Sequence, residues 1–419
     1  MKVIHVSTQD IRGGAARSAR RLHQGLQRIG WSSTMFVKEK TCLDPTILRF
    51  EPPRGLVTRL RGRVRREVIA RGFSRYQASR PEGYELFSDD RTPFREAVVE
   101  QVPSCDVVNL HWVAGLLDIT SFFPQMTQTT PVVWTLHDMN AFTGGCHYDD
   151  GCGRFRGTCG ACPQLGSTVE RDLSRAIWER KHKAFTHVRP GALRIVTPSR
   201  WLAEEATRST LFAGLQTDVI PYGIDVEQFS PRDRACARDV LGISQDARVV
   251  LFLADVVDNR RKGFSLLLEA LPHCAQQVDR LLLVSLGFSP PKVDTGAPWL
   301  HLGTVNDDRF LSLVYSAADL FVLPSLQDNL PNTVLEAMAC GVPVVSFNAG
   351  GTTDLVRPGI TGHLAPAFEV PAFASAIIEL LNTPTKRNEM AKNCRRIVLE
   401  EYSLELQAQR YSELYKSLL

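Results

Sequence analysis

Residues 323–356, LPSLQDNLPNTVLEAMACGVPVVSFNAGGTTDLV, pass from an apolar strand through a polar loop into a helix and then into a second apolar strand. We expect the first strand over 319–325 and the second over 343–347. Pro331 and Asn332 suit the first turn of the helix between them. This order of elements predicts a parallel sheet that helices cover on both faces.

The same alternation extends in both directions along the chain. We expect further strands at 2–7, 34–37, 106–111, 131–137, 194–198, 247–254, 280–287 and 299–303, and helices at 371–382, 385–401 and 403–418. The strands form two sets, which divide near 221–233, where Pro and Gly residues interrupt the periodicity. The chain is therefore predicted to be an α/β protein with two doubly wound, Rossmann-like domains, 1–222 and 223–400, that face each other across a ligand cleft. Residues 401–419 are expected to form a helix that packs back on the first domain.

The composition is that of a soluble globular chain. A length of 419 residues, with 44% hydrophobic and 22% charged residues, suits two domains. It excludes a disordered tail protein, a fibre and a small disulfide-stapled domain. The N-terminal MKVIHVSTQD begins no long apolar run, so neither a signal peptide nor a membrane span is predicted. We expect the protein in the cytoplasm.

A glycine pair follows the first expected strand. Gly13 and Gly14 precede a helix that we expect to open at Ala15 or Ala16. Two adjacent glycines let the backbone approach a ligand closely, and the helix N-terminus offers N–H groups to an anion. The spacing of a dinucleotide site is missing, so a plain strand-to-helix turn remains an equal alternative.

Basic residues follow the first expected strand of the second domain. Arg260, Arg261 and Lys262 stand just ahead of Gly263 and a helix. Cations at that place suit a pyrophosphate, whereas a solvated basic turn is the alternative.

Two acidic residues stand in the stretch 323–356, one in the loop and one on the expected helix. Asp328 and Glu336 have seven residues between them, so one acid in the loop and one on the helix can face the same site. A carboxylate there can accept two hydrogen bonds from a ribose diol. Two acids at this spacing also occur often by chance.

The segment D-N-L-P-N-T-V-L-E (328–336), followed by A-M-A-C-G-V-P-V-V and N-A-G-G, resembles the donor-site motif of the retaining glycosyltransferases of family 4, which have the GT-B fold. The likeness spans the chain. The Gly13-Gly14 loop, T-L-H-D (135–138), P-Y-G-I-D (221–225) and R-K-G (261–263) occur in the family's order. The resemblance implies a bacterial enzyme of polysaccharide biosynthesis, with a nucleotide diphosphate sugar as donor and a lipid-linked or cell-surface saccharide precursor as acceptor.

The resemblance also implies roles for single residues. Glu336 would hold the ribose hydroxyls and Lys262 the phosphates, Asp328 and the backbone of 329–331 would face the transferred sugar, and His137 would sit beside the reacting centre. The donor-binding residues expected in this way are Gly13, Gly14, Arg261, Lys262, Asp328, Asn329, Leu330, Pro331, Thr333 and Glu336, and the catalytic residues are His137, Lys262 and Asp328.

Three positions depart from the family's pattern. The first acid of the motif is usually Glu and is Asp328 here. Ala254 and Asp255 stand where the family commonly has Gly-Arg, so Arg260 or Arg261 would have to supply a second phosphate-binding cation. The usual Asn of the hinge motif is Tyr222.

The expected chemistry needs no metal ion. Charge appears on the departing diphosphate in retaining transfer, and Lys262, a neighbouring Arg and helix N-termini can stabilise it. The sequence has no D-x-D pair at the end of an expected strand that would bind a catalytic divalent ion. His137 ends its strand at the cleft, where the alternative is a structural histidine, and His111 is a second candidate.

Two other functions stay open. A sugar-nucleotide epimerase of the same fold uses a similar donor cleft without an acceptor. A catalytically silent protein that binds a nucleotide sugar is the other alternative, and the missing Gly-Arg favours it.

A cysteine-rich loop spans 143–165. Cys146, Cys152, Cys159 and Cys162 are spaced C-x5-C-x6-C-x2-C, and four thiolates can close a tetrahedral structural zinc site. The alternatives are an iron–sulfur cluster, unliganded or redox-active thiols, and a zinc site in which His147 replaces one Cys. No catalytic cofactor is expected.

The segment RGLVTRLRGRVRREVIARGF (54–73) combines an apolar stripe, Leu56, Leu60, Val64 and Val68, with Arg flanks. Ten Arg in 49–80 face only Glu51 and Glu67, although the whole chain has 49 basic and 45 acidic residues. The patch is too local to indicate nucleic acid, but it is typical of a helix on an anionic membrane surface. A helix that packs the stripe on its own domain is the alternative.

Overall fold

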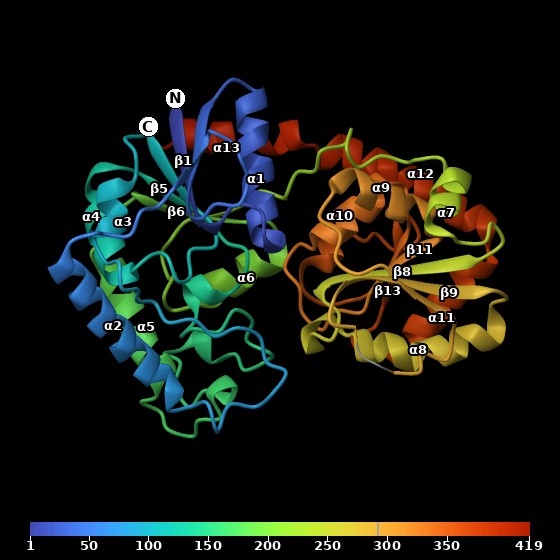
Figure 1. The fold of residues 1–419 in the computed structure, drawn as a ribbon, viewed down its shortest axis with the longest axis horizontal. Helices are drawn as coiled ribbons and strands as arrows, with labels where there is room; N and C mark the ends of the chain where they lie inside the picture. Colours follow the sequence, from blue (N-terminus) through green and yellow to red (C-terminus); the bar gives the residue numbers. More distant parts are fainter. Residues whose placement is uncertain (291–292) are drawn as a thin grey trace. The chain divides into compact units, whose positions relative to one another are not determined.

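The computed structural model describes residues 1–290 and 293–419. The chain divides into two compact units: unit 1 comprises Met1–Pro221 and Gln407–Leu419, and unit 2 comprises Tyr222–Leu406. Both chain termini therefore belong to unit 1 (Figure 1). In the described residues, no helix is long and apolar enough to cross a membrane.

Unit 1 is built on a seven-stranded parallel sheet of order β3-β2-β1-β4-β5-β6-β7. Its strands are β1 (Lys2–Gln9), β2 (Ser32–Glu39), β3 (Ile47–Arg49), β4 (Val107–Leu110), β5 (Val132–Thr135), β6 (Leu193–Thr197) and β7 (Thr217–Val219). Its helices are α1 (Gly13–Arg28), α2 (Leu56–Ser74), α3 (Ala97–Gln101), α4 (Ile119–Thr129), α5 (Leu173–Thr186) and α6 (Arg200–Arg208), with three 3-10 turns at Asn140–Phe142, Arg154–Arg156 and Pro163–Leu165.

Unit 2 has a six-stranded parallel sheet of order β10-β9-β8-β11-β12-β13. Its strands are β8 (Arg248–Val256), β9 (Leu281–Phe288), β10 (Trp299–His301), β11 (Leu320–Leu323), β12 (Val344–Phe347) and β13 (Gly362–Ala365). Its helices are α7 (Arg234–Leu241), α8 (Phe264–Gln277), α9 (Asp308–Ala317), α10 (Asn332–Ala339), α11 (Val370–Asn382) and α12 (Pro384–Glu401), with 3-10 turns at Arg260–Lys262 and Gly350–Asp354.

Each sheet is buried on both faces, as the apolar strands predict. In β1, Val3 belongs to one core cluster and Ile4 to another, because successive side chains point to opposite faces. In β8, Val249 and Val250 likewise belong to two different core clusters. The last helix, α13 (Leu404–Lys416), contributes Tyr411 and Tyr415 to the core of unit 1.

All ten strands expected from the sequence are present, together with three short strands, β3, β7 and β13, at the sheet edges. One expected boundary is wrong: α1 begins at Gly13 and not at Ala15 or Ala16. The φ of Gly13 is +81°, a value that glycine adopts without strain, so the helix can start at the first glycine of the pair.

Helix α2 leaves its apolar stripe in solvent. Leu56, Leu60, Val64 and Val68 are 84%, 64%, 58% and 54% exposed. No residue of the helix is buried. The alternative in which this stripe packs on its own domain is therefore wrong.

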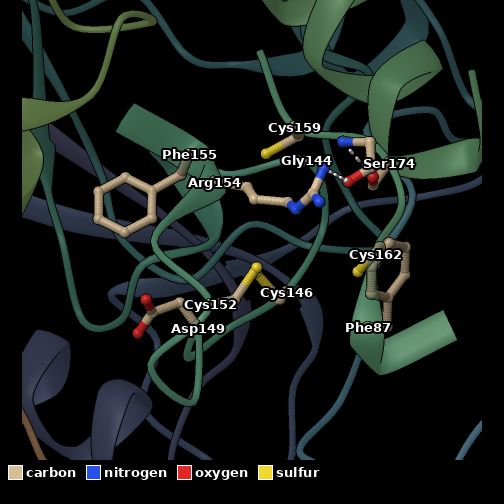
Figure 2. Close-up of a pocket in the computed structure, with 11 residues that line it drawn as sticks. Phe87, Gly144, Cys146, Asp149, Cys152, Arg154, Phe155, Cys159, Cys162 and Ser174 are labelled. Atoms are coloured by element: carbon tan, nitrogen blue, oxygen red, sulfur yellow. Dashed lines mark hydrogen bonds between the residues drawn. The ribbon is translucent and has the colours of Figure 1, made fainter. Parts of the chain in front are cut away.

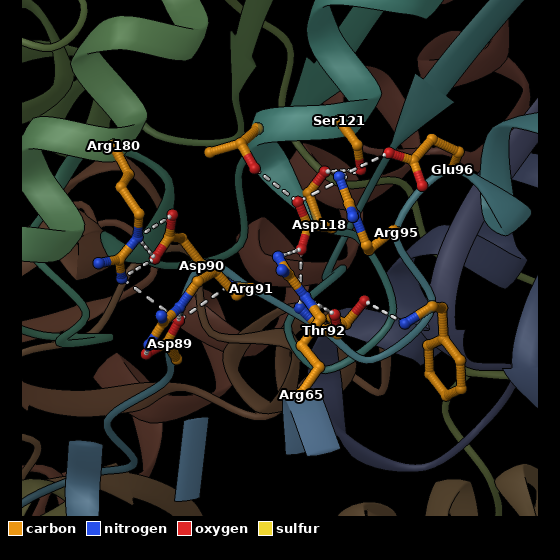
Figure 3. A network of polar contacts seen from close by, with 12 residues as sticks. Arg65, Asp89, Asp90, Arg91, Thr92, Arg95, Glu96, Asp118, Ser121 and Arg180 are labelled. Atoms are coloured by element: carbon orange, nitrogen blue, oxygen red, sulfur yellow. Dashed lines mark hydrogen bonds and ion pairs between the residues drawn. The ribbon is translucent and has the colours of Figure 1, made fainter. Parts of the chain in front are cut away.

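The opposite face of α2 contacts unit 1. A Cβ on Gly62 would lie 3.5 Å from the carbonyl oxygen of Pro93, so the helix comes close to the chain there. Arg65 forms an ion pair of 2.6 Å with the buried Asp118 and donates to the carbonyl oxygen of Thr92 at 2.8 Å (Figure 3). In the same network Arg180 pairs with Asp90. Polar contacts on one face thus leave the apolar face of α2 free to meet a surface.

Candidate functional site

Both sheets have a topological switch point, where the strand order reverses. It lies between β1 and β4 in unit 1 and between β8 and β11 in unit 2. Ligands of open α/β sheets bind at the carboxyl ends of the strands at such points. Most of the expected site residues follow these strands or their neighbour β5.

A charged triad of Arg261, Lys262 and Asp328 occupies the switch point of unit 2. Lys262 Nζ donates to Asp328 Oδ2 at 2.7 Å, and Arg261 Nη1 lies 3.3 Å from Asp328 Oδ1. Burial alone raises the pKa of the Asp328 carboxyl, but the two cations and the N–H of Asn329 outweigh burial and hold that pKa below its ordinary value. The triad brings two cations to one point, and two cations that can both donate suit a phosphate group better than a lone lysine does.

Two glycines allow the loops around the triad to meet. Gly263 has a φ of +70°, and a Cβ there would lie 1.9 Å from the carbonyl oxygen of Pro324. A Cβ on Gly350, whose φ is +59°, would lie 2.2 Å from the carbonyl oxygen of Asp328. Any other residue at either position would push these segments apart.

Glu336 lies on α10 and is only 2% exposed. The hydroxyl of Tyr315, on α9, donates to Glu336 Oε2 at 3.0 Å. Tyr315 was not expected from the sequence, because only the packing of α9 against α10 brings it to the acid. A carboxylate oxygen has two lone pairs, so Glu336 can accept hydrogen bonds from a ligand while it accepts one from Tyr315.

The remaining expected residues of unit 2 line the segment between the two acids. Asn329, Leu330 and Pro331 are buried, and Thr333 in the first turn of α10 is partly exposed. Of the two arginines considered as the second cation, Arg261 contacts Asp328, and its Nη1 also donates to the carbonyl oxygen of Gln327 at 2.8 Å. Arg260 is exposed, so Arg261 is the better placed of the two.

Three histidines form a chain across the switch point of unit 1. His5 Nδ1 lies 2.9 Å from His111 Nε2, and His111 Nδ1 lies 3.0 Å from His137 Nε2. His5 lies within β1, His111 follows β4 and His137 follows β5. The sequence reasoning missed His5, whose only signal was a polar residue inside an apolar strand.

His137 and His111 line a pocket, the histidine pocket, at the ends of β4 and β5. Its polar and aromatic lining includes His111, Trp112, Trp134, His137, Asp138 and Asn140. Burial lowers the pKa of His137 to about 4 and lowers the pKa values of His5 and His111 well below their ordinary values. All three imidazoles are therefore neutral at pH 7, and each has one N–H to donate.

Asp138 orients a fourth histidine. Its Oδ2 lies 2.6 Å from His147 Nδ1 and accepts from Trp112 Nε1 at 2.9 Å, and Ser88 Oγ lies 2.8 Å from His147 Nε2. Burial raises the pKa of Asp138, but His147 and the N–H of Asn140 outweigh burial and hold it below its ordinary value. His147 thus supports the wall of the histidine pocket, although the sequence suggested it only as a substitute metal ligand.

The four clustered cysteines line a second pocket of unit 1, the cysteine pocket (Figure 2). In the part of the chain that the structure describes, all ten cysteines are free of disulfide bonds. Within residues 1–290 and 293–419, no three His, Cys, Asp or Glu side chains already stand close enough together to hold a metal ion.

The sequence is similar to known glycosyltransferases. The family model "Glycosyl transferases group 1" matches residues 247–383, which include the charged triad and Glu336. A D-inositol 3-phosphate glycosyltransferase of Kribbella flavida is 31% identical over 210 residues, 45% of this chain and 49% of that protein. The matched part thus spans about half the length of this relative. The D-inositol 3-phosphate glycosyltransferase of Mycobacterium sp. (strain KMS) is 26% identical, over 85% of this chain and 75% of the length of that protein.

Solved structures share the fold over the full length of the chain. The sucrose-phosphate synthase of Thermosynechococcus elongatus superposes with a TM-score of 0.65 and 22% identity, covering 100% of this chain and 99% of its own. Anabaena HepE, solved in complex with UDP-glucose, superposes with a TM-score of 0.69 and 17% identity, covering 100% of both chains. Residues 247–383 are therefore similar to the group 1 glycosyltransferases, and the chain has the GT-B fold of its structural neighbours.

Proposed function

We propose that this protein transfers a sugar from a nucleotide diphosphate sugar to a saccharide or lipid-linked acceptor, with retention of the anomeric configuration and without a catalytic metal ion. The observation that carries the proposal is the charged triad at the switch point of unit 2, followed along the chain by the buried Glu336 on α10. HepE, which has the same fold, was solved with UDP-glucose, and this supports a donor of that class.

In this proposal the donor's diphosphate binds to Lys262 and Arg261. A bound diphosphate competes with Asp328 for the two cations, so Asp328 can turn one oxygen toward the transferred sugar. Glu336, held by Tyr315, accepts hydrogen bonds from the ribose hydroxyls. The backbone of Asn329, Leu330 and Pro331, together with Thr333, completes the wall around the sugar.

The chemical step requires stabilisation of the charge that grows on the departing diphosphate. Lys262 and Arg261 supply positive charge, and the N-terminus of α1 at Gly13 and Gly14 supplies N–H groups. The neutral His137 can accept or donate a hydrogen bond to the sugar or acceptor. The leaving phosphate takes the acceptor's proton in this mechanism.

The proposal is tested with the purified full chain and a panel of UDP, GDP and ADP sugars. A donor at 100 times its Kd should stabilise the fold by about 2.7 kcal/mol, which thermal unfolding detects. The donor found in this way is then radiolabelled at the sugar and incubated with and without a bacterial lipid extract. Label on lipid, in the same anomeric configuration by NMR, supports the proposal.

Other outcomes identify the alternatives. An epimerised free sugar nucleotide indicates an epimerase, and binding without turnover indicates a silent partner. Lys262→Ala should reduce the thermal shift, whereas Lys392→Ala, which changes an exposed lysine on α12, serves as the matched control. A panel in which no nucleotide sugar shifts the wild type contradicts the proposal.

We also propose that α2 holds the enzyme on the inner face of the membrane, as a peripheral protein near a lipid-linked acceptor. The support is the exposed stripe from Leu56 to Val68 with arginines on both sides of it. Each basic residue near an anionic surface contributes about 1 kcal/mol, and salt weakens this attraction.

Vesicle sedimentation tests the membrane proposal. We expect binding to vesicles of equal parts phosphatidylglycerol and phosphatidylcholine at low salt, and little binding to phosphatidylcholine alone. Changing Arg59, Arg61, Arg63 and Arg66 to Gln should weaken it, and Arg65 is kept because it pairs with Asp118. The control changes Arg208, Arg309, Lys392 and Arg396 to Gln and removes the same charge elsewhere on the exposed surface. Equal sedimentation of the two variants contradicts a role for α2.

A further inference from the structure

The cysteine pocket is a separate feature that the transfer reaction does not use. Its lining includes all four clustered cysteines, with Phe87 and Ser174 among the other residues around it (Figure 2). Its cavity volume is about 20 Å³, which is room for a single ion or one water-sized occupant. Four sulfurs around one small space are therefore the defining property of this part of unit 1.

Side chains at the start of α5 hold the loop that carries these cysteines. The N–H of Cys162 donates to Asp172 Oδ2 at 2.8 Å, the N–H of Gly160 donates to Ser174 Oγ at 2.9 Å, and Arg175 Nε donates to the carbonyl oxygen of Cys159 at 2.9 Å. Cysteine binds a metal ion as the thiolate, so an ion that enters this pocket displaces the thiol protons.

The backbone around the C-x2-C turn is held in an unusual conformation. Cys159 and Ala161 have φ values of +49° and +41°, which side-chain-bearing residues rarely adopt. A Cβ on Gly160, between them, would lie 2.2 Å from the carbonyl oxygen of Glu170. A turn that is both left-handed and tightly packed costs free energy, and it persists only where other interactions hold it.

A buried cation lies beside the pocket. Lys181 is 1% exposed, and its ammonium group donates to the carbonyl oxygen of Thr143 at 3.1 Å. Four thiolates around a divalent ion carry two net negative charges, which a buried ammonium group partly balances.

We propose that Cys146, Cys152, Cys159 and Cys162 together bind one zinc ion, which fixes the loop that supports the histidine pocket. The thiols face one pocket but do not yet stand at coordination distance in the described residues, so their side chains must rotate inward as the ion binds. The four thiols release their protons to solvent, and four Zn–S bonds form. No redox step is involved.

The consequence for the enzyme follows from chain connectivity. Cys146 is followed directly by His147, which holds Asp138 at 2.6 Å, and Asp138 lines the histidine pocket next to His137. Thr143 Oγ also donates to the carbonyl oxygen of Cys146 at 2.6 Å. A metal that holds Cys146 therefore positions His147 and Asp138 without touching the substrate.

Metal content of the full chain tests the proposal without any activity measurement. The wild type, purified under reducing conditions after growth with zinc, should contain about one zinc per chain. Replacement by cobalt should give the absorption spectrum of tetrahedral cobalt thiolate. Cys159→Ser and Cys162→Ser should each lose most of the zinc, whereas Cys274→Ser and Cys394→Ser, buried cysteines of unit 2, should retain it.

A measurement on the wild type covers the case in which the loop variants fail to fold. In the native protein, a strong chelator should make four further thiols available to alkylation, while the buried Cys274, Cys340 and Cys394 stay protected. Wild-type protein that contains no zinc and takes up none on reconstitution under reducing conditions overturns the proposal. Iron and acid-labile sulfide in the protein would overturn it in favour of a cluster, and zinc that all four serine variants retain would place the metal elsewhere.

Discussion

The two switch points have the same topology and opposite chemistry. In unit 1 the reversal between β1 and β4 carries uncharged imidazoles, with His5, His111 and His137 in a buried hydrogen-bonded chain. In unit 2 the reversal between β8 and β11 carries full charges, with Lys262 and Arg261 on Asp328. One sheet edge is thus suited to neutral hydrogen bonding and the other to an anion.

The difference depends on whether charged neighbours outweigh the effect of burial on the pKa of each group. Burial disfavours the charged form of every group, and at His137 it outweighs the nearby Asp138, which raises the pKa, so the imidazole loses its proton. Asp328 keeps its charge because two cations contact it. A doubly wound sheet therefore supplies the position of a site, and the partners of each ionisable group decide its charge. The following predictions test this contrast.

The largest effect is expected in unit 2. Lys262→Ala removes the cation that we propose stabilises the leaving diphosphate, and losses of one such group cost about 10²–10³-fold in kcat. Turnover with the donor that the nucleotide-sugar panel identifies measures the loss. Arg260→Ala, which removes a neighbouring exposed charge, should change kcat little. Equal effects of the two substitutions would remove Lys262 from the reaction.

The counterpart in unit 1 is His137. A neutral imidazole at the reacting centre contributes mainly to the transition state, so His137→Ala should lower kcat by about 10²-fold and leave donor affinity within twofold. Steady-state kinetics and nucleotide titration separate the two quantities. His182→Ala changes an exposed histidine of the same unit and serves as the control. Near-normal turnover of His137→Ala would make this histidine structural.

The pH dependence of stability should differ between the units. The pKa values of His5, His111 and His137 are lowered, so between pH 6.5 and about 4 the unfolded chain binds protons that the folded chain does not. The free energy of unfolding of unit 1 should then fall as the pH falls, by up to about 1.4 kcal/mol per pH unit for each histidine. In unit 2 the partly buried His301 acts in the same direction, and the lowered pKa of Asp328 acts only below about pH 4.

Tryptophan fluorescence during urea unfolding measures this difference. Trp31, Trp112, Trp134, Trp178 and Trp201 report on unit 1, and Trp299 reports on unit 2. In a His137→Asn variant, the free energy of unfolding of unit 1 should fall less steeply as the pH falls, because the contribution of one histidine is lost. An unfolding free energy of unit 1 that stays constant from pH 7 to pH 5 would contradict neutral, buried imidazoles.

The contrast also indicates which parts were predictable from sequence. The strands, the Gly13 turn and the 328–336 motif are local patterns, and each is recognisable within a few dozen residues. The imidazole chain was not predicted as a whole, because it depends on the register that sets His5 beside Asn109 and on residues more than 100 positions apart. The edge strands β3 (ILR), β7 (TDV) and β13 (GHLA) were not predicted, because Arg, Asp, Gly or His in each leaves no apolar run to recognise.

The smallest expected effect concerns the residue that the sequence did not reveal in unit 2. Tyr315→Phe removes the hydroxyl that donates to Glu336 Oε2 and leaves the ring in place. One such hydrogen bond is worth about 0.5–1.5 kcal/mol, so nucleotide affinity should weaken by up to about tenfold, with kcat nearly unchanged. Glu336→Ala should cost more, about 1.5–3 kcal/mol, because bonds to a charged group are lost. The control is Tyr411→Phe, the same change beside Thr135 in unit 1, which should leave nucleotide affinity unaltered. If Tyr315 acts through Glu336, then Tyr315→Phe should have no further effect in the Glu336→Ala background. Additive losses would show instead that the two residues act on the nucleotide independently.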